Sequence, residues 1–107
     1  MIGPIPPVHP GEILREEFLI PLDITPYAVA RACMVPRTRI ERLAREETPV
    51  TADTALRLGR YFKTGPEFWV NLQAMYDLVV ASQSAPEIIE IKPRDNTVSL
   101  QEPVPCR

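Results

Sequence analysis

The side chains with the most specific chemistry in this sequence lie in the segment PRTRIERLAR, which ends at position 45. Its arginine and threonine residues are Arg37, Thr38, Arg39, Arg42 and Arg45. An arginine guanidinium fits guanine O6 and N7 as a bidentate donor, and a threonine can bond a base edge or contact a thymine methyl group. The chemistry that this segment offers is therefore recognition of DNA.

Helical spacing gives these residues different expected roles. In a recognition helix the N-terminal residues contact base edges in the major groove, while the preceding helix crosses the backbone. Arg37, Thr38 and Arg39 occupy that N-terminal turn. Arg42 lies one turn further along, and we expect Arg45 to reach only phosphate. The alternative is a merely solvated face, which is the usual role of arginines on a short helix.

A helix-turn-helix would hold this segment in the required position. Its two helices cross near a right angle, so the first needs a small residue at the crossing and both need apolar residues on the inner side. Ala30 supplies the small contact. The expected inner side consists of Val29, Cys33, Val35, Ile40 and Leu43. Together with a capped first helix and a three-residue turn, this pattern favours a helix-turn-helix over a solvated face.

Capping residues and apolar periodicity predict five helices in an all-α bundle. Prolines in first turns and threonine N-caps mark the helix starts, with Thr25 and Thr51 as the caps of the second and fourth helices. The expected helices run from Pro10 to Pro21, from Pro26 to Cys33, from Pro36 to Glu47, from Ala52 to Phe62, and from Pro66 to about Ser82.

At 107 residues the chain fits one domain, whose core is large enough to fold without metal or disulfides. We expect an N-terminal arm over 1–8, a helix-turn-helix domain with a dimerising fifth helix over 9–83, and a poorly structured C-terminal tail over 84–107. Within the tail, 87–91 and 97–100 are apolar runs. Each could form a weak strand or become ordered on a partner.

The charge distribution is more informative than the net charge of −2, which by itself argues against a generally basic surface. Positions 31–60 carry seven arginines against four acidic residues, a net +3, whereas 1–30 carry −3 and 61–107 carry −2. Positive charge is therefore concentrated around the expected recognition helix, as for an element that faces an anion.

The fifth helix has a broad apolar surface. Its expected inner stripe is Phe68, Leu72, Met75 or Tyr76, and Val79. We assign Phe68 to the core, whereas Trp69 fits either the core or a partner groove. Because Val70 and Val80 widen the apolar surface beyond one stripe, a dimer interface is its natural use.

The sequence gives little support to a metal-binding, phosphate-binding or catalytic site. His9, the only histidine, is expected to cap or begin the first helix. Cys33 and Cys106 are far apart and are expected to be reduced. We find no metal-ligand spacing, no phosphate-binding glycine loop and no catalytic set, so we predict no metal, no cofactor and no enzyme activity. With no apolar run of about 18 residues and no signal peptide, the expected location is the cytoplasm, without membrane contact.

The chain also resembles a known family, the HigA-type antitoxins within the XRE (lambda-repressor-like) helix-turn-helix proteins. The resemblance runs from His9 to about Leu78. It depends on the segments HPGEILREEFL, VPRTRIERL, TADTALRLGRYF and, above all, GPEFWVNLQAMYDL.

The resemblance implies a five-helix lambda-repressor-like fold and a homodimer that binds a palindromic operator in double-stranded DNA and represses its own operon. It also implies a RelE-like ribonuclease toxin as partner, which the antitoxin neutralises. The DNA-reading positions would be Arg37, Thr38, Arg39 and Arg42. Thr25 and Tyr27 would lie near phosphate at the start of the second helix.

Two positions depart from the family pattern. Met34 stands where relatives usually have glycine in the turn, and a left-handed backbone there costs on the order of 1 kcal/mol. Glu46 and Glu47 stand where relatives have a basic, glycine-containing loop. These carboxylates either weaken phosphate binding or belong to a loop that points away from DNA.

Three functions are consistent with these observations. The leading hypothesis is a dimeric antitoxin and autorepressor. The first alternative is a helix-turn-helix transcriptional regulator that acts without a toxin. The second is an interaction protein in which Met34 and the acidic loop have removed the affinity for DNA.

Overall fold

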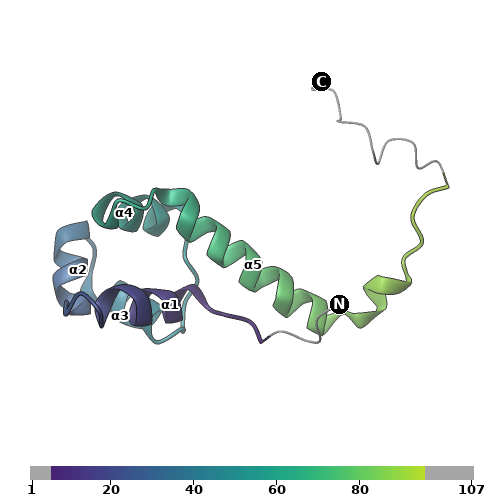
Figure 1. The fold of residues 1–107 in the computed structure, drawn as a ribbon, viewed down its shortest axis with the longest axis horizontal. Coiled ribbons are helices and arrows are strands. Elements are labelled where there is room, and N and C mark those ends of the chain that lie inside the picture. Colours follow the sequence, from purple (N-terminus) through teal and green to yellow (C-terminus); the bar gives the residue numbers. More distant parts are fainter. Residues whose placement is uncertain (1–5, 96–107) are drawn as a thin grey trace, which may run out of the picture.

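The computed structural model describes residues 6–95 (Figure 1). The elements in order are α1 (Pro10–Ile13), the π-helical turn η1 (Leu14–Leu19), α2 (Pro26–Cys33), α3 (Arg37–Ala44), α4 (Ala52–Phe62), α5 (Pro66–Ser84) and the 3₁₀ helix η2 (Pro86–Glu90). Counting α1 and η1 as one continuous helix, this is the predicted five-helix, all-α fold, and no strand occurs among the described residues.

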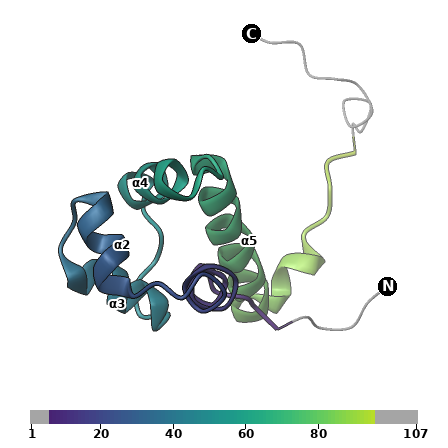
Figure 2. The same cartoon turned by 60° about the vertical axis from the view of Figure 1, so that its left-hand side comes forward.

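The first four helices form a ring at one end of the molecule, and α5 runs from this ring past the first helix and beyond it (Figure 1). Figure 2 looks along the first helix and shows it between α3 and α5. The closest packing pairs are α4 with α5 and α2 with α3. The outer half of α5 therefore has few neighbours within the described chain.

Local capping explains where the helices begin. Thr25 accepts a hydrogen bond from the Ala28 amide at 3.0 Å, and Thr51 accepts one from the Thr54 amide at 3.3 Å. His9 Nδ1 accepts a hydrogen bond from the Gly11 amide at 2.9 Å, which confirms its predicted capping role. Because these side chains satisfy amides that have no partner inside the helix, they set its start. The predicted bounds of α2 and α4 are confirmed.

The first helix differs from the expected regular α-helix. Its second half is a π-helix, in which the Ile20 amide bonds the Arg15 carbonyl five residues back. Both Leu14 and Leu19 of this π-helical segment are buried in the core. The helix ends at Leu19, two residues before the predicted end at Pro21.

The third helix is shorter than predicted, because it ends at Ala44 rather than Glu47. Glu46 adopts a left-handed backbone with φ 65°. The amides of Glu46 and Glu47 then bond the carbonyls of Leu43 and Arg42, at 2.8 and 2.9 Å. This pair of bonds is a Schellman-type closure, which terminates a helix whatever its side-chain pattern.

The core lies inside the ring of helices. Its buried hydrophobic residues are Leu14, Leu19, Val29, Ala30, Cys33, Ile40, Leu43, Ala44, Val50, Ala55, Leu58 and Trp69. Trp69 is completely buried and is the only buried residue of α5. Phe68, which we predicted to be in the core, is 38% exposed, and Met75 is 60% exposed. The predicted inner stripe of α5 is therefore wrong at these two positions, whereas Leu72 packs against the core and Tyr76 and Val79 are partly buried.

The C-terminal segment also differs from one expectation. Residues 86–90 form a 3₁₀ helix, so the predicted alternative of a strand over 87–91 is wrong. Pro86 favours the first turn of a helix and cannot donate to a strand ladder. The predicted run over 97–100 and Cys106 lie outside the described residues, whereas Cys33 is buried and unbridged. In the described part of the chain, every helix is too short or too polar to cross a membrane.

Candidate nucleic-acid interface

The turn between α2 and α3 keeps the geometry of a glycine-containing turn although it contains Met34. This residue is left-handed, with φ 62° and ψ 45°, and its side chain is 79% exposed. The Val35 amide bonds the Ala30 carbonyl at 3.0 Å, and Arg57 Nη1 donates to the Cys33 carbonyl at 2.9 Å. These hydrogen bonds hold the turn closed.

The inner side of the helix-turn-helix is assembled as predicted. Ala30 is 2% exposed where α2 packs against α3. The predicted inner residues Val29, Cys33, Ile40 and Leu43 are buried, and Val35 is partly buried against them. Burial also raises the pKa of the Cys33 thiol, so this side chain acts as a small apolar group. The two helices therefore form a packed unit that fixes the outer face of α3.

The predicted reading residues all lie on that outer face and are exposed. Arg37 pairs with Glu41 one turn along α3, at 3.3 Å. Arg39 pairs with Asp53 at the start of α4. Arg42 makes no ion pair with any residue that the structure describes.

Three of the reading residues share an open groove of about 400 Å³ beside α3. Thr38, Arg39 and Arg42 form one wall, and the loop and first turn that lead into α4 form the other. From that second wall come Thr48 and Thr51, which the sequence analysis did not assign to the site. The Thr48 hydroxyl adds hydrogen-bonding capacity next to the arginines, whereas the Thr51 hydroxyl is occupied as the cap of α4.

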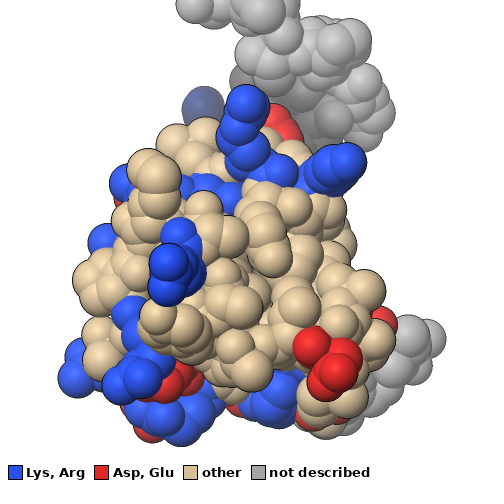
Figure 3. Space-filling view, turned by 90° about the vertical axis from the view of Figure 1, so that its left-hand side faces the viewer, with Lys and Arg blue, Asp and Glu red and all other residues tan. Residues whose placement is uncertain are grey.

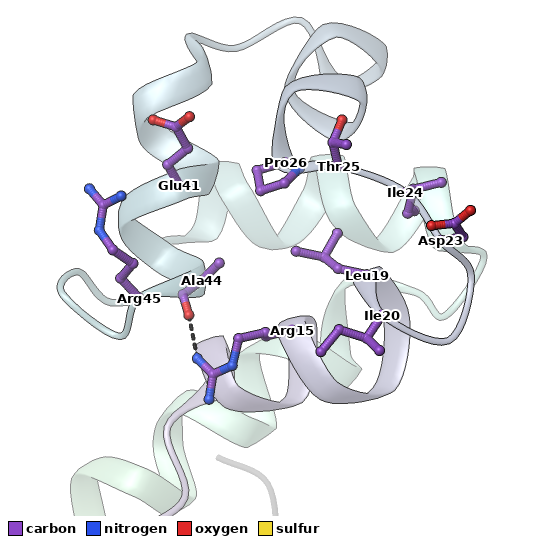
Figure 4. Close-up of a pocket in the computed structure, with 10 residues that line it drawn as sticks. All are labelled: Arg15, Leu19, Ile20, Asp23, Ile24, Thr25, Pro26, Glu41, Ala44 and Arg45. Carbon is purple, nitrogen blue, oxygen red and sulfur yellow. Dashed lines mark hydrogen bonds between the residues drawn. The ribbon is translucent and has the colours of Figure 1, made fainter.

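Thr25 and Arg45 lie elsewhere, at a second groove of about 680 Å³ between the first helix, the start of α2 and the end of α3 (Figure 4). Thr25 is occupied as a cap, and Arg45 pairs with Glu47 at 3.1 Å. Tyr27 is 51% exposed on α2, and its hydroxyl accepts a hydrogen bond from Arg31 at 3.1 Å. These three residues thus flank the reading face without joining the groove beside α3.

The two carboxylates of the loop after α3, Glu46 and Glu47, pair with different arginines. Glu46 accepts a hydrogen bond from Arg15 of the first helix at 3.1 Å, while Arg15 Nη1 also donates to the Ala44 carbonyl at 2.6 Å, the bond drawn in Figure 4. Glu47 pairs with Arg45. Glu46 is thus directed toward the first helix, and only Glu47 remains beside the exposed arginines of α3.

Asp53 and Arg57 are the residues that sequence reasoning most clearly missed. Asp53 Oδ2 accepts hydrogen bonds from both Arg39 and Arg57, and these two guanidinium groups lower the pKa of the Asp53 carboxyl. The i,i+4 spacing of Asp53 and Arg57 is a signal that the sequence did contain. Their contact with α3 joins positions far apart in the chain and is visible only in the fold.

Figure 3 shows the end of the molecule that carries α2, where basic side chains outnumber acidic ones around a largely uncharged centre. Positions 31–60, with their net +3, supply the end of α2, all of α3 and most of α4. Within residues 6–95 no three His, Cys, Asp or Glu side chains are grouped to hold a metal ion. What the site offers is a set of hydrogen-bond donors and positive charges. A packed pair of helices with such donors on the outer face of the second defines a helix-turn-helix protein.

Comparison with known proteins agrees with this class. No family model matches the chain. Virulence-associated protein I of Dichelobacter nodosus is 47% identical over 89 residues, which cover 83% of this chain and 82% of that protein. Antitoxin HigA-1 of Vibrio cholerae is 40% identical over 72 residues, or 67% of this chain and 68% of that one. The structure of Pseudomonas aeruginosa antitoxin HigA with the higBA promoter superimposes with a TM-score of 0.77 at 45% identity, covering 85% of this chain and 99% of that one.

The chain belongs to the HigA-type antitoxins, within the XRE family of helix-turn-helix proteins.

Proposed function

We propose that this protein is a cytoplasmic antitoxin that binds its own operator as a homodimer, represses its operon and neutralises a RelE-like ribonuclease toxin. The observation that carries the DNA-binding part is the exposed N-terminal turn of α3, held across α2 by a closed left-handed turn at Met34. The related P. aeruginosa antitoxin, whose structure includes promoter DNA, supports it.

The proposed division of roles follows the geometry. Arg37, Thr38, Arg39 and Arg42 read base edges, because they are exposed on the first two turns of α3. Arg45, Thr25 and Tyr27 contact phosphate, since they flank that face. Surface ion pairs are worth at most about 1 kcal/mol, so those that the arginines make in the free protein do not prevent their contact with DNA.

The homodimer is proposed from the apolar surface outside the ring of helices. Val70, Met75 and Leu78 on α5 are 45%, 60% and 63% exposed, and Leu56 on α4 is 60% exposed. Contiguous exposed apolar surface usually marks an interface. A twofold dimer would present two copies of α3 to two half-sites of a palindrome.

The toxin is the least directly supported partner. The name of the V. cholerae relative and the family resemblance support it. A toxin would bind surfaces away from α3 if it bound together with DNA. A regulator that acts without a toxin remains the alternative, and an adjacent gene for a small ribonuclease whose product co-purifies with this protein would decide for the antitoxin.

The test of DNA binding uses the purified full chain with its own promoter fragment and with scrambled DNA of equal length. Binding to both is measured over a salt series, because phosphate contacts weaken steeply as salt rises. We expect tighter binding to the promoter at every salt concentration. Equal binding of the two DNAs at all salts would reject the reading face and favour the interaction protein.

A further inference from the structure

Asp53 connects the recognition helix with two other elements. It lies in the first turn of α4 and is shared between Arg39 of α3 and Arg57, one turn along α4. The Arg57 Nε lies 2.9 Å from the carboxylate oxygen. Because a carboxylate offers about four lone-pair sites, it can accept from both guanidinium groups at once.

The same Arg57 connects Asp53 to the turn of the helix-turn-helix. Its Nη1 donates to the Cys33 carbonyl at 2.9 Å and reaches the Met34 carbonyl at 3.5 Å. These carbonyls lie where α2 ends and the left-handed turn begins. Hydrogen bonds therefore run without interruption from that turn through Arg57 and Asp53 to the guanidinium of Arg39.

We propose that Asp53 is a positioning residue for operator recognition, which orients the Arg39 guanidinium on the reading face before DNA arrives. This inference rests on the proposed function of α3 as the reading helix. An arginine side chain loses much rotamer freedom when it is fixed at an interface, and prior orientation reduces that loss for the one geometry that suits a base edge.

The negative charge of Asp53 acts in the same direction. A carboxylate beside the groove repels phosphate, so it weakens binding to any DNA sequence. The correct sequence regains affinity through the oriented arginine, whereas other sequences do not. Asp53 therefore raises the discrimination between operator and other DNA, while lowering overall affinity.

The Arg39–Asp53 ion pair affects DNA discrimination rather than the stability of the fold. Arg39 and Asp53 have side-chain exposures of 40% and 52%, and pairs so exposed add little to stability. The expected result of removing Asp53 is a change in DNA discrimination with little change in the unfolding temperature.

The experiment measures the ratio of operator affinity to scrambled-DNA affinity for the full-length Asp53→Asn variant. We expect this ratio to fall about fivefold, the low end of what one good base contact contributes. Binding to scrambled DNA should become tighter at low salt. Asp53→Ser, which removes the carboxylate with a different side chain, should give the same fall.

Glu47→Gln is the matched control, because it also removes one negative charge near α3 but leaves Arg39 and Asp53 paired. We expect it to tighten binding to both DNAs by a similar factor and to preserve the ratio. A fall in the ratio as large as that of Asp53→Asn would mean that charge alone sets discrimination, and would overturn the positioning role.

The Arg39→Ala variant shows whether Asp53 acts on DNA binding through Arg39. If Asp53 acts through Arg39, adding Asp53→Asn to Arg39→Ala should leave the ratio unchanged. An equal fall in both backgrounds, or no fall in either, would overturn the inference. Loss of operator preference by the unmodified protein is a different result, which would reject the proposed function itself.

Discussion

The three arginines of α3 differ in the ion pairs that they make in the free protein. Arg37 is paired within its own helix, Arg39 with the next helix, and Arg42 with no residue that the structure describes. The local positive charge is thus partly neutralised before DNA binds. Each pair is exposed and weak, so the arginines remain available while their starting orientations differ.

The Arg39→Ala variant tests whether the oriented arginine reads a base. We expect it to weaken binding to a cognate half-site by about 1–3 kcal/mol, because a bidentate base contact is lost. Titration of promoter DNA with wild type and variant measures the difference. Unchanged affinity would remove Arg39 from the set of reading residues.

The Met34→Gly variant tests the strain in the turn. A left-handed non-glycine residue costs about 1–2 kcal/mol, and the greater freedom of glycine in the unfolded chain offsets part of that gain. Little packing is lost, since the side chain is 79% exposed. We therefore expect the free energy of unfolding to rise by about 0.5–1 kcal/mol in urea denaturation. A less stable variant would show that the methionine side chain contributes a contact in the folded protein.

At the scale of the elements, two contacts set how the helices meet. Gly59 on α4 lies against the backbone that begins α5, where an added Cβ would be 2.4 Å from the Gly65 carbonyl carbon. His9 caps α1 and stacks edge-to-face on Tyr76 of α5, with ring centroids 4.8 Å apart. The packing of α5 therefore depends on Gly59 at its start and on His9 further along the helix.

The Gly59→Ala variant should be less stable, although alanine is the better helix former by about 1 kcal/mol. The added methyl group would clash with backbone that cannot turn away, and overpacking of this kind costs about 1–3 kcal/mol or more. Thermal unfolding measures the change, with Ser82→Ala on the exposed end of α5 as the control for propensity. A stabilised Gly59→Ala protein would contradict the close approach.

The cap at His9 should make stability depend on pH. Burial lowers the pKa of His9 below 6.5, its ordinary value, and only the neutral ring can accept the Gly11 amide. As the pH falls through the unfolded value, the unfolded chain binds a proton that the folded chain does not, so stability declines. His9→Asn keeps a capping oxygen without titrating and should lose less stability between pH 7 and 5. Equal losses in the two proteins would exclude His9 as the cause.

At the scale of the whole molecule, the helices divide into a packed ring and a projecting α5. The ring contains almost the whole core, whereas α5 buries only Trp69 and leaves Met75 and Leu78 outside. In the proposed function, the ring recognises DNA and α5 is available for association with a second copy.

The Leu78→Glu variant tests that association. A charge at the centre of an apolar interface would be desolvated without a partner, so we expect the dimer to dissociate and operator affinity to fall. Sedimentation measures the mass, and promoter titration the affinity. Gln83→Glu adds the same charge near the end of α5 and should remain dimeric. A Leu78→Glu protein that also stays dimeric would place the interface elsewhere.

Local features of the sequence were sufficient to predict much of the fold. The starts of α2 and α4 depend on Thr25 and Thr51, whose caps act within three residues. The inner side of the helix-turn-helix also followed from spacing, because apolar positions on two short helices have one mutual arrangement that buries them all. The outer face of α3, with its arginines, was then fixed by exclusion.

The tertiary structure decided what depends on residues distant in sequence. Phe68 and Trp69 are adjacent aromatics, and only the angle at which α5 meets the ring buries the second and exposes the first. The helical pattern places Arg39 on the outer face, but its partner Asp53 is visible only once α4 is packed beside α3. Sequence periodicity specifies the face on which a side chain lies, whereas its neighbours across the fold depend on how whole helices pack.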